Sequence, residues 1–478
     1  MDGGVGDMKR LLLLGAGHAH AQVLLDWARA PLPGVEITVV SPLPRTPYSG
    51  MVPGWLAGRY SWDEITIDFA ALCAHAGARW LAAEVQALDP SLRTVQLDDG
   101  SSLGWDLLSL NIGSTLRAPT LAHGDMLPLR PLSRLHDAWD AQLARLKAPH
   151  GARALTVTAV GGGAAGVESL LAVLARLRRL QPDRKLHGRL VSSAEVLLPG
   201  LAWGAVRHAR RALAAAGVEV HLSTAFEADG HTPGGMSGIS SMSGISGISA
   251  ITEISAISEI SAISPIRPIR PISPISPISP ISATRAESEL VLWATGAEAH
   301  DLLADPARRG GLAVSERGYV RIDRGLRSVS HPHVFAVGDC ADWAEPLPKA
   351  GVFAVRMGPV LAHNLRAALG AGTAQVYRPQ HRFLVLLDTS DGAAIASRGV
   401  FFARGLWAAR WKESIDRRFV ARFAAPAASR ASSSASAPAT PPAKTATDAR
   451  GNACPSAATA AASSKLTPTP TPSSGDLA

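Results

Sequence analysis

The fold class of this chain is indicated most directly by Leu11-Leu12-Leu13-Leu14-Gly15-Ala16-Gly17-His18-Ala19-His20. The leucines predict a buried strand, and the apolar pattern that follows predicts a helix over residues 18–29. Gly15 permits a sharp turn between them, and Gly17 lets backbone N–H groups approach a phosphate at the partly positive helix N-terminus. The stretch therefore predicts a phosphate-binding turn, although His20 replaces the small residue that usually completes the fingerprint.

A second stretch carries the complete fingerprint. Residues 154–160 predict an uninterrupted apolar strand, and Gly161-Gly162-Gly163-Ala164-Ala165-Gly166 then leads into a helix that ends near Leu180. A G-x-G-x-x-G at such a junction predicts a dinucleotide site. The next predicted strand, residues 190–192, ends in serine where an acid often binds ribose hydroxyls, so NADH and NADPH both stay open.

The chain between these two turns predicts further strands. Residues 35–40 form a strand that ends at Ser41, which can bond a ribose hydroxyl more weakly than a carboxylate can. Residues 46–54 are turn-rich and apolar, so they either pack against a flat ligand or form a buried structural loop. Residues 79–88, 94–97 and 107–111 predict the strands of an inserted sheet, the last of which runs into Gly113.

Two later strands also end in glycine. Residues 290–293 predict a strand that leads to Gly296, and residues 333–337 predict one that leads to Gly338 and Asp339. A helix is expected to open between residues 346 and 351 and to run to about Leu369. We expect the Asp339 carboxylate to accept a hydrogen bond from a polyol, while the helix N-terminus favours negative charge.

Composition and charge limit the classes of function that the chain can have. The 478 residues carry a formal net charge of +8, but the arginines are scattered along predicted helices, which favours a solvated basic surface and no nucleic-acid partner. The three widely spaced cysteines, Cys73, Cys340 and Cys454, argue against a disulfide scaffold and fit a reducing compartment. No signal peptide or spanning apolar run is found, so the sequence predicts a cytoplasmic protein, soluble or peripheral on a membrane.

Two segments have a low-complexity composition. Isoleucine recurs at every third position from Ile245 to Ile281, within an insertion over residues 231–286. This period matches neither a helix nor a strand, so we expect a disordered repeat, with a docking arm as the alternative. Residues 424–478 are rich in Ala, Ser, Thr and Pro, and they predict a disordered tail.

The order of these motifs resembles the pyridine nucleotide-disulfide oxidoreductase superfamily, whose members are flavoproteins with two dinucleotide-binding domains. Five segments make the resemblance more specific: the turn at residues 17–20, the Pro-Tyr-Ser-Gly-Met block at 47–51, the Asn-Ile-Gly-Ser turn at 111–114, Gly338-Asp339-Cys340, and residues 348–351. They are similar to type II NADH dehydrogenase-like flavoproteins, including the module sometimes fused to selenophosphate synthetase. The resemblance covers residues 9–423 apart from the repeat.

This resemblance implies an α/β fold with two Rossmann-like domains, a short C-terminal module and disordered segments. The FAD-binding domain is discontinuous, over residues 8–120 and 310–378. The NAD(P)H-binding domain is inserted between them over residues 121–309, and the C-terminal module spans residues 379–423.

The resemblance also implies two cofactor sites and no metal. Residues assigned to FAD are Gly15, Gly17, His18, His20, Ser41, Gly113, Gly338 and Asp339. Residues assigned to the NAD(P)H side are Gly161, Gly163, Gly166, Glu168 and Gly296. Glu168 is expected near the nicotinamide, and Lys349 is expected to add positive charge near the flavin.

The expected reaction is that of an FAD-dependent oxidoreductase. Because the chain contains no C-x-x-C or C-x-x-x-x-C, we expect hydride to pass from NADH or NADPH to the flavin without a redox-active disulfide. Electrons would then leave to a quinone or another small acceptor. Two alternatives stay open: a nicotinamide-responsive flavoprotein that acts mainly through protein interaction, and a sulfur- or selenium-linked reductase.

Residues 405–423 predict an amphipathic helix. Trp407, Trp411, Ile415 and Phe419 recur every four residues. Basic residues complement this stripe, namely Arg410, Lys412, Arg417, Arg418 and Arg422. Such a helix can lie on an anionic membrane and bring a quinone to the flavin, or it can pack on its own domain or across a homodimer.

Overall fold

The computed structural model describes residues 8–121, 124–147, 154–227, 281–282, 288–345, 347–380 and 382–424. The predicted isoleucine repeat, apart from Ile281, lies outside these residues, and so do Cys454 and the predicted tail beyond residue 424.

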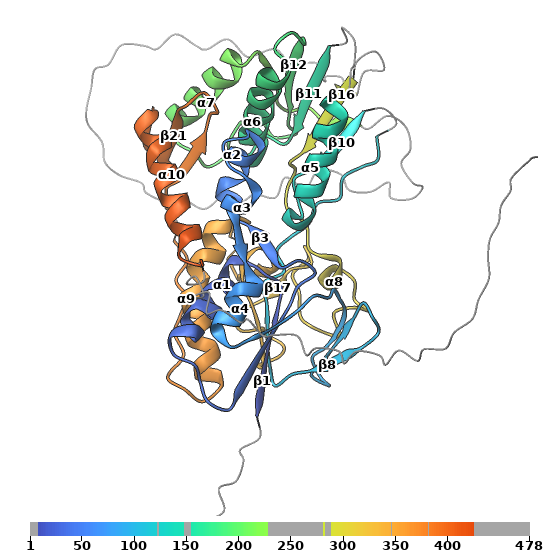
Figure 1. The fold of residues 1–478 in the computed structure, drawn as a ribbon, viewed down its shortest axis with the longest axis vertical. Coiled ribbons are helices and arrows are strands. Elements are labelled where there is room, and N and C mark those ends of the chain that lie inside the picture. The colour runs from blue at the N-terminus through green and yellow to red at the C-terminus, as the bar shows by residue number, and fades with distance from the viewer. Residues whose placement is uncertain are drawn as a thin grey trace, which may run out of the picture. The chain divides into compact units, whose positions relative to one another are not determined.

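The first parallel sheet has five strands in the order β18-β9-β1-β2-β5, and its strand β1 is labelled near the bottom of Figure 1. Their bounds are Lys9–Leu14 for β1, Val35–Val40 for β2, Arg79–Leu81 for β5, Leu107–Leu110 for β9 and Val334–Ala336 for β18. Strand β1 is central and pairs in parallel with β2 and β9. Its leucines are buried because helices cover a parallel sheet on both faces. Helix α1 (His18–Arg29), which matches the predicted helix, packs against α4 (Phe69–Ala76) and α9 (Gly351–Ala368).

The predicted inserted sheet is partly wrong. Strand β9 belongs to the first parallel sheet, where all of its residues are buried, and β5 lies at the edge of the same sheet. The inserted sheet is instead antiparallel and consists of β6 (Val85–Asp89), β7 (Thr94–Leu97) and β8 (Ser102–Gly104). A continuous apolar run such as Leu107–Leu110 suits a strand covered on both faces, and this distinguishes it from its half-buried neighbours.

The second parallel sheet has the order β10-β16-β11-β12-β13. Its strands are Asp125–Pro128 (β10), Leu155–Val160 (β11), Leu186–Val191 (β12), Val218–His221 (β13) and Ser288–Trp293 (β16). Helices α5 (Leu132–Lys147), α6 (Ala164–Leu180) and α7 (Trp203–Ala215) accompany it, and α6 packs on β11 and β12. The chain therefore has the predicted α/β fold with two parallel sheets, while the predicted domain boundaries stay predictions.

Residues 46–54 are largely buried within the protein. The turn η1 (Ser49–Met51) and helix α2 (Val52–Leu56) place Met51 and Leu56 in the same apolar cluster as residues of α6. These contacts favour the structural interpretation of the segment. The remaining short elements are β3 (Arg45–Pro47), α3 (Trp62–Ile65), β4 (Thr66–Asp68), β14 (Phe226–Glu227), β15 (Ile281–Ser282), α8 (Asp301–Ala304), β17 (Val320–Arg321), η2 (Gly338–Cys340) and β19 (Ala341–Asp342).

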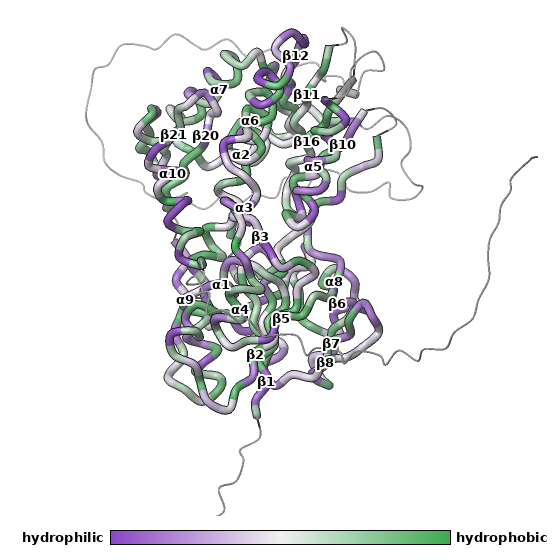
Figure 2. The backbone as a smooth tube through the Cα atoms, viewed as in Figure 1, coloured by the Kyte–Doolittle hydropathy of each residue, from purple (hydrophilic) through white to green (hydrophobic). Residues whose placement is uncertain are grey.

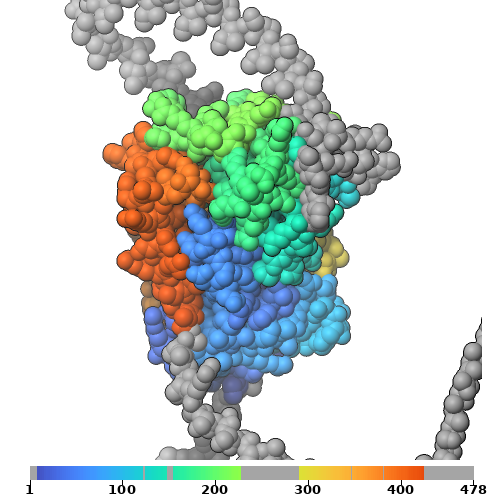
Figure 3. All heavy atoms as spheres, turned by 45° about the horizontal axis from the view of Figure 1, so that its top comes forward, coloured from blue at the N-terminus to red at the C-terminus, as the bar shows by residue number. Residues whose placement is uncertain are grey.

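The C-terminal module is an antiparallel sheet with one helix. Strands β20 (Val385–Asp388), β21 (Ala394–Arg398) and β22 (Phe401–Gly405) precede helix α10 (Leu406–Ala421). Hydrophobic and hydrophilic residues alternate along α10, as expected for an amphipathic helix (Figure 2). The module, orange in Figure 3, lies beside green residues of the second sheet's helices and blue residues of the N-terminal segment. Contacts of β21 and β22 with α7 account for part of this packing.

Candidate functional site

The first glycine turn joins β1 to α1. Gly15 has a φ of +92° and donates its N–H to Val40 O at 2.8 Å, so the chain turns sharply at the end of the strand. Gly17 is the N-cap residue of α1 in an extended conformation, and no side chain of its own caps the helix. A Cβ on Gly17 would lie 2.1 Å from Asn111 Oδ1. The turn therefore requires glycine because the Asn111 side chain is packed against it.

Asn111 holds three strand ends together, and sequence reasoning missed it as a site residue. Its Oδ1 accepts hydrogen bonds from the N–H groups of Ala19 and His20 at 3.1 and 3.4 Å. Its Nδ2 donates to Val337 O at 3.0 Å. Asn111 thus caps α1 from the end of another strand and links β1, β9 and β18. The only local signal for Asn111 is the Asn-Ile-Gly-Ser turn that it begins.

His20 has partners within the protein for both ring nitrogens. Nδ1 lies 2.7 Å from Gly15 O, and Nε2 lies 2.9 Å from Ser109 Oγ. Because a carbonyl only accepts, Nδ1 carries the proton and Nε2 accepts from the hydroxyl. Burial lowers the pKa of His20 to about 4, against the hydrogen bond to Gly15, so the ring is neutral at pH 7. These contacts explain how a histidine fits the small-residue position, while its predicted contact with FAD stays a prediction.

His18 is the first residue of α1. Its ring contacts those of Tyr48 and Phe419, with centroids 5.5 and 5.8 Å away. Burial lowers its pKa to about 4, although the nearby Asp339 carboxylate opposes the shift. Within the described residues, the buried Nε2 atom has no hydrogen-bond partner. A buried polar atom without a partner costs free energy, so this nitrogen is suited to a polar group of a ligand.

Asp339 follows β18 in the turn η2. Its Oδ2 accepts a hydrogen bond from Ser114 Oγ at 3.1 Å and forms an ion pair with Arg130. Gly338 has a φ of +71°, and a Cβ there would lie 2.9 Å from Asn111 Nδ2. The structure therefore brings Asp339 together with the first glycine turn, and Asn111 lies between them. Sequence reasoning missed Arg130 because it follows β10, a strand of the other sheet.

Lys349 lies close to Asp339 and is not a surface residue. Its side chain is 9% exposed, and its Nζ donates to Ala341 O at 2.5 Å and lies 3.6 Å from Asp342 Oδ1. Burial lowers its pKa, while the nearby Asp342 carboxylate acts in the opposite direction. Lys349 lines a small cavity together with Gly338, Asp339, Phe353 and Met357.

The second glycine turn joins β11 to α6. Gly161 has a φ of +125°, and a Cβ there would lie 2.3 Å from Ala294 O. A Cβ on Gly166 would lie 2.0 Å from Gly161 O, so both glycines allow β11, α6 and the end of β16 to approach closely. By contrast, a Cβ on Gly163 or Gly296 would meet no atom of the described protein within 4 Å. These two glycines therefore border open space rather than protein.

Both turns leave room for a dinucleotide nearby, although Asn111 Oδ1 already accepts from the N–H groups of Ala19 and His20 at the first turn. Gly163 is the N-cap of α6, no side chain caps the helix there, and a Cβ on Gly163 would meet no described atom within 4 Å, so a phosphate can approach this helix N-terminus. A Cβ on Gly113, whose φ is +75°, would likewise meet none of the described atoms within 4 Å. Ser41 follows β2 and donates its hydroxyl to Leu43 O at 3.3 Å, so its predicted ribose contact stays a prediction.

Glu168 projects from α6 toward the C-terminal module. Its Oε1 accepts a hydrogen bond from the Asp388 N–H at 2.7 Å. Burial raises its pKa to about 7, against the opposing effect of Lys412. Glu168 can therefore hold or release a proton near neutral pH. The structure brings Glu168 together with α10 and β20, a neighbourhood that the sequence did not predict.

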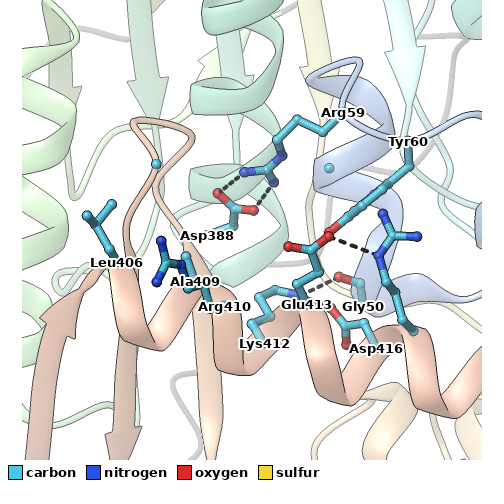
Figure 4. Close-up of a pocket in the computed structure, with 13 residues that line it drawn as sticks. Gly50, Arg59, Tyr60, Asp388, Leu406, Ala409, Arg410, Lys412, Glu413 and Asp416 are labelled. Atoms are coloured by element: carbon cyan, nitrogen blue, oxygen red, sulfur yellow. Dashed lines mark hydrogen bonds and ion pairs between the residues drawn. The ribbon is translucent and has the colours of Figure 1, made fainter.

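A cavity of about 220 Å³ is lined by residues of α2, β20 and α10 (Figure 4). Lys412 Nζ lies 2.7 Å from Asp416 Oδ2 and also donates to Gly50 O, while Arg59 forms an ion pair with Asp388. The Asp416 carboxylate also accepts a hydrogen bond from Tyr48, whose pKa is raised mainly by burial. Charged side chains thus dominate the lining, and sequence reasoning missed Arg59, Asp388 and Asp416.

Helix α10 is packed on the protein along one face and exposed along the other. Trp407, Trp411 and Ile415 are exposed, at 52%, 43% and 37%, but Phe419 is buried against His18 and Tyr48. Lys412 is also buried in its pair with Asp416, so it is not part of an exposed basic face. Further large apolar residues of the module and of α7 are exposed, namely Trp203, Val400, Phe401, Phe402 and Leu406.

The cysteines that the structure describes are buried and free. Burial raises the pKa of Cys73 to about 12 and that of Cys340 to about 11. The Cys340 thiol donates to Val337 O at 3.2 Å, which fits a structural role. Across the described ranges, no group of three or more His, Cys, Asp or Glu side chains is arranged to hold a metal ion. In the same part of the chain, every helix is too short or too polar to span a lipid bilayer.

Comparisons with known proteins agree with this architecture. Residues 279–365 match the family model described as pyridine nucleotide-disulphide oxidoreductase. The sulfide:quinone oxidoreductase from the hyperthermophilic bacterium Aquifex aeolicus is 15% identical, with a TM-score of 0.61, over 87% of this chain and 91% of that chain.

Two further solved structures share the fold. NDH2 from Plasmodium falciparum, in complex with NADH, is 11% identical, with a TM-score of 0.62, over 87% of this chain and 97% of that chain. The water-forming NADH oxidase from Lactobacillus brevis, bound to NADH, is 17% identical, with a TM-score of 0.54, over 82% of this chain and 75% of that chain. The chain thus has the α/β fold of two Rossmann-like units found in these oxidoreductases.

Proposed function

We propose that this chain is an FAD-dependent oxidoreductase that takes hydride from NADH or NADPH and passes electrons to a quinone or another small acceptor. One observation carries the proposal. Each parallel sheet has a glycine turn after its central β1 or β11 strand, and Asp339 lies beside the first turn, where Asn111 packs against both Gly17 and Gly338 and the Asp339 carboxylate acts on His18. A cofactor with a hydroxyl group that meets the Asp339 carboxylate would suit the first turn, and a second dinucleotide would suit the other turn.

FAD would bind at the first turn and supply the hydride-accepting chemistry when bound. Gly15 and Gly17 would bring the N-terminus of α1 close to a pyrophosphate, which would bind N–H groups other than those of Ala19 and His20, because Asn111 already bonds these two. His18 Nε2 would supply a polar contact from a buried position. Asp339 would accept a hydrogen bond from a hydroxyl of the cofactor. Helix α9 begins at Gly351 without a side-chain cap, so its N-terminus and Lys349 would favour negative charge nearby.

NADH or NADPH would bind at the second turn, where Gly163 and Gly296 border open space. Glu168 follows this turn, and its pKa of about 7 suits a group that holds or moves a proton during turnover. The Asp388 N–H would keep the Glu168 carboxyl oriented. The two buried thiols, Cys73 and Cys340, have raised pKa values and are poor nucleophiles, which supports a reaction without a redox disulfide.

A quinone acceptor is supported by the exposed apolar surface of the C-terminal module. Trp407, Trp411 and Ile415 of α10 are exposed, and so is Phe401 of the strand β22, which contacts α10. Arg410 is exposed on the same helix. Aromatic and basic side chains in this arrangement suit the interface of an anionic membrane, where quinones dissolve. The charged cavity lined by α10 would then take a polar head group.

Anaerobic mixing of the FAD-loaded full chain with NADH or NADPH tests the proposed reaction. We expect the visible absorbance of the flavin to bleach, and to return when a short-chain quinone is added. Bound FAD that neither nucleotide bleaches would contradict the proposal. That result would instead favour the alternative, in which nicotinamide binding regulates a protein interaction.

Flotation with vesicles of anionic lipid tests the membrane partner. We expect the full chain to float with these vesicles, and the Trp407→Ser/Trp411→Ser variant to remain mostly in the soluble fraction. Leu92→Ser, which removes an apolar side chain that is 74% exposed and lies outside the C-terminal module, serves as a control that keeps the tryptophans and the arginines of α10. If the tryptophan variant floats like the wild type, the membrane assignment is wrong, and a tryptophan-dependent homodimer in sedimentation would favour packing between copies.

A further inference from the structure

Arg130 connects the two parallel sheets at the Asp339 turn. It follows the edge strand β10 of the second sheet by two residues, whereas Asp339 follows β18 of the first sheet. Its Nη1 donates to Asp339 Oδ2 and to Ser114 Oγ, and its Nη2 lies 3.5 Å from Lys349 O. The Arg130 side chain is 30% exposed and that of Asp339 is 13% exposed. Arg130 thus contacts three separate segments of the predicted flavin site.

These contacts fix the orientation of the Asp339 carboxylate. Both the guanidinium and the Ser114 hydroxyl donate to Oδ2. Among the described residues, Oδ1 has no hydrogen-bond donor, so it is the atom left to accept from a ligand hydroxyl. A charge-assisted hydrogen bond holds its acceptor more firmly than a neutral one does, and a planar guanidinium resists rotation more than an ammonium does.

The positive charge of Arg130 also affects the electrostatics around Asp339. The Lys349 ammonium is already bound to Ala341 O and lies near Asp342 and over the ring of Tyr319, at 3.8 Å from its centroid. Arg130 is therefore the cation that balances Asp339 directly. Without it, a partly buried carboxylate would stand unpaired at the site, and its negative charge would oppose the added electrons of a reduced flavin.

We propose that Arg130 is a positioning residue of the flavin site: it holds Asp339 so that Oδ1 meets a hydroxyl of FAD, and it neutralises that carboxylate during flavin reduction. The inference rests on the proposed function for the presence of FAD. It adds a residue from the second sheet to a site otherwise built on the first. The flavin site would therefore depend on how the segment after β10 packs against η2.

The test compares Arg130→Met and Arg130→Lys with the wild-type full chain. Arg130→Met removes the charge and the hydrogen bonds to Asp339, Ser114 and Lys349 O, while Arg130→Lys keeps the charge and loses the planar fork. Arg134→Met is the matched control, since Arg134 is an exposed arginine four residues further along. FAD affinity is measured by titration of the FAD-depleted chain, and the reduction potential is measured by equilibration with a reference dye and a chemical reductant.

We expect Arg130→Met to weaken FAD binding by about tenfold or more, because a charge-assisted hydrogen bond is lost. We also expect it to lower the reduction potential of the flavin, because the negative charge of Asp339 is no longer balanced. Arg130→Lys should lose part of the affinity and keep the potential near the wild-type value, and Arg134→Met should change neither. A thermal midpoint measured without FAD separates these effects from misfolding, because a purely structural arginine would lower the midpoint and leave the potential unchanged.

The proposal is overturned if Arg130→Met binds FAD with wild-type affinity and potential, or if the wild-type chain binds no FAD. Neither readout uses a nicotinamide. A wild-type chain that binds FAD but is not reduced by NADH or NADPH would therefore contradict the proposed function and leave the role of Arg130 intact.

Discussion

Single residues show why the glycines of the two turns are not equivalent. At Gly17 and Gly166, a Cβ would collide with protein atoms, 2.1 Å from Asn111 Oδ1 and 2.0 Å from Gly161 O. At Gly163 and Gly296, it would point into open space. The first pair is therefore needed for packing, whereas the second pair leaves room that a ligand can use.

This difference predicts opposite outcomes for two alanine variants. Gly163 has a backbone conformation that alanine can adopt, with φ of −80° and ψ of 180°, so Gly163→Ala should fold with wild-type stability and bind NAD(P)H about tenfold more weakly. Gly166→Ala should instead lower the free energy of unfolding by about 1–3 kcal/mol, because its methyl group overpacks the turn. Nucleotide titration and urea unfolding separate the two.

Two results would contradict these roles of the turn glycines. One is a Gly163→Ala variant with unchanged nucleotide affinity, which would mean that the open space is not the binding site. The other is a Gly166→Ala variant as stable as the wild type, which would mean that Gly161 O can move aside at little cost.

Helix α10 has two faces with different roles. Its outer face exposes Trp407, Trp411 and Ile415, while its inner face buries Phe419 and the Lys412–Asp416 ion pair. The nearby carboxylates of Glu168 and Asp416 raise the pKa of Lys412, although burial alone would lower it. The inner face therefore joins the C-terminal module to α6 through paired charges rather than through apolar contacts alone.

Removing one partner of this buried pair should destabilise the chain. Lys412→Met leaves the Asp416 carboxylate buried without its cation, so we expect the free energy of unfolding to fall by about 3–5 kcal/mol. Arg410→Met, an exposed change on the same helix, should alter it by less than about 0.5 kcal/mol. Urea unfolding followed by tryptophan fluorescence measures both.

A double variant checks the cause. Lys412→Met/Asp416→Leu removes both charges, so it should recover part of the stability that Lys412→Met loses. If the double variant is no more stable than the single one, Lys412 stabilises the chain through packing rather than by neutralising Asp416.

For the whole molecule, buried titratable groups set how stability depends on pH. Burial lowers the pKa of His18 and His20 from 6.5 to about 4, so the unfolded chain takes up these protons first. Their contribution is fully present above pH 6.5 and is lost as the pH falls toward 4, on the order of 3 kcal/mol each. Glu168 acts oppositely: its pKa is raised from 4.5 to about 7, so its contribution is present below pH 4.5 and is lost as the pH rises through 7.

These opposing effects predict the pH dependence of unfolding. Between pH 6.5 and 4.5 the two histidines take up protons in the unfolded chain, whereas Glu168 holds one proton in the folded chain. The loss of stability from the two histidines is therefore larger than the gain from Glu168, and the urea midpoint should fall as the pH is lowered. Glu168→Gln removes the opposing contribution, and the dependence of its unfolding free energy on pH should be steeper by about one proton. Glu195→Gln, which changes an exposed carboxyl, should follow the wild type. Equal slopes for Glu168→Gln and the wild type would show that Glu168 does not carry a proton in the folded chain.

The two strand-turn-helix units follow from the local sequence alone. Continuous apolar strands, glycines at their ends and the periodic helices that follow are local signals, and the structure has β1 with α1 and β11 with α6 where they were predicted. The closeness of Asp339 to the first turn could also be expected, because strand ends of one parallel sheet meet at one edge.

The side chains that complete these turns depend on long-range packing. Asn111 caps α1 from the end of β9, Arg130 reaches Asp339 from the second sheet, and Lys412 is buried near Glu168. The sequence also placed Leu107–Leu110 in the wrong sheet, and it left open whether Phe419 and Lys412 pack on the protein or lie on an exposed face. The local sequence pattern indicates whether a residue suits a strand or one face of a helix. It does not report which distant segment covers that face, because this depends on how the sheets and the C-terminal module pack together.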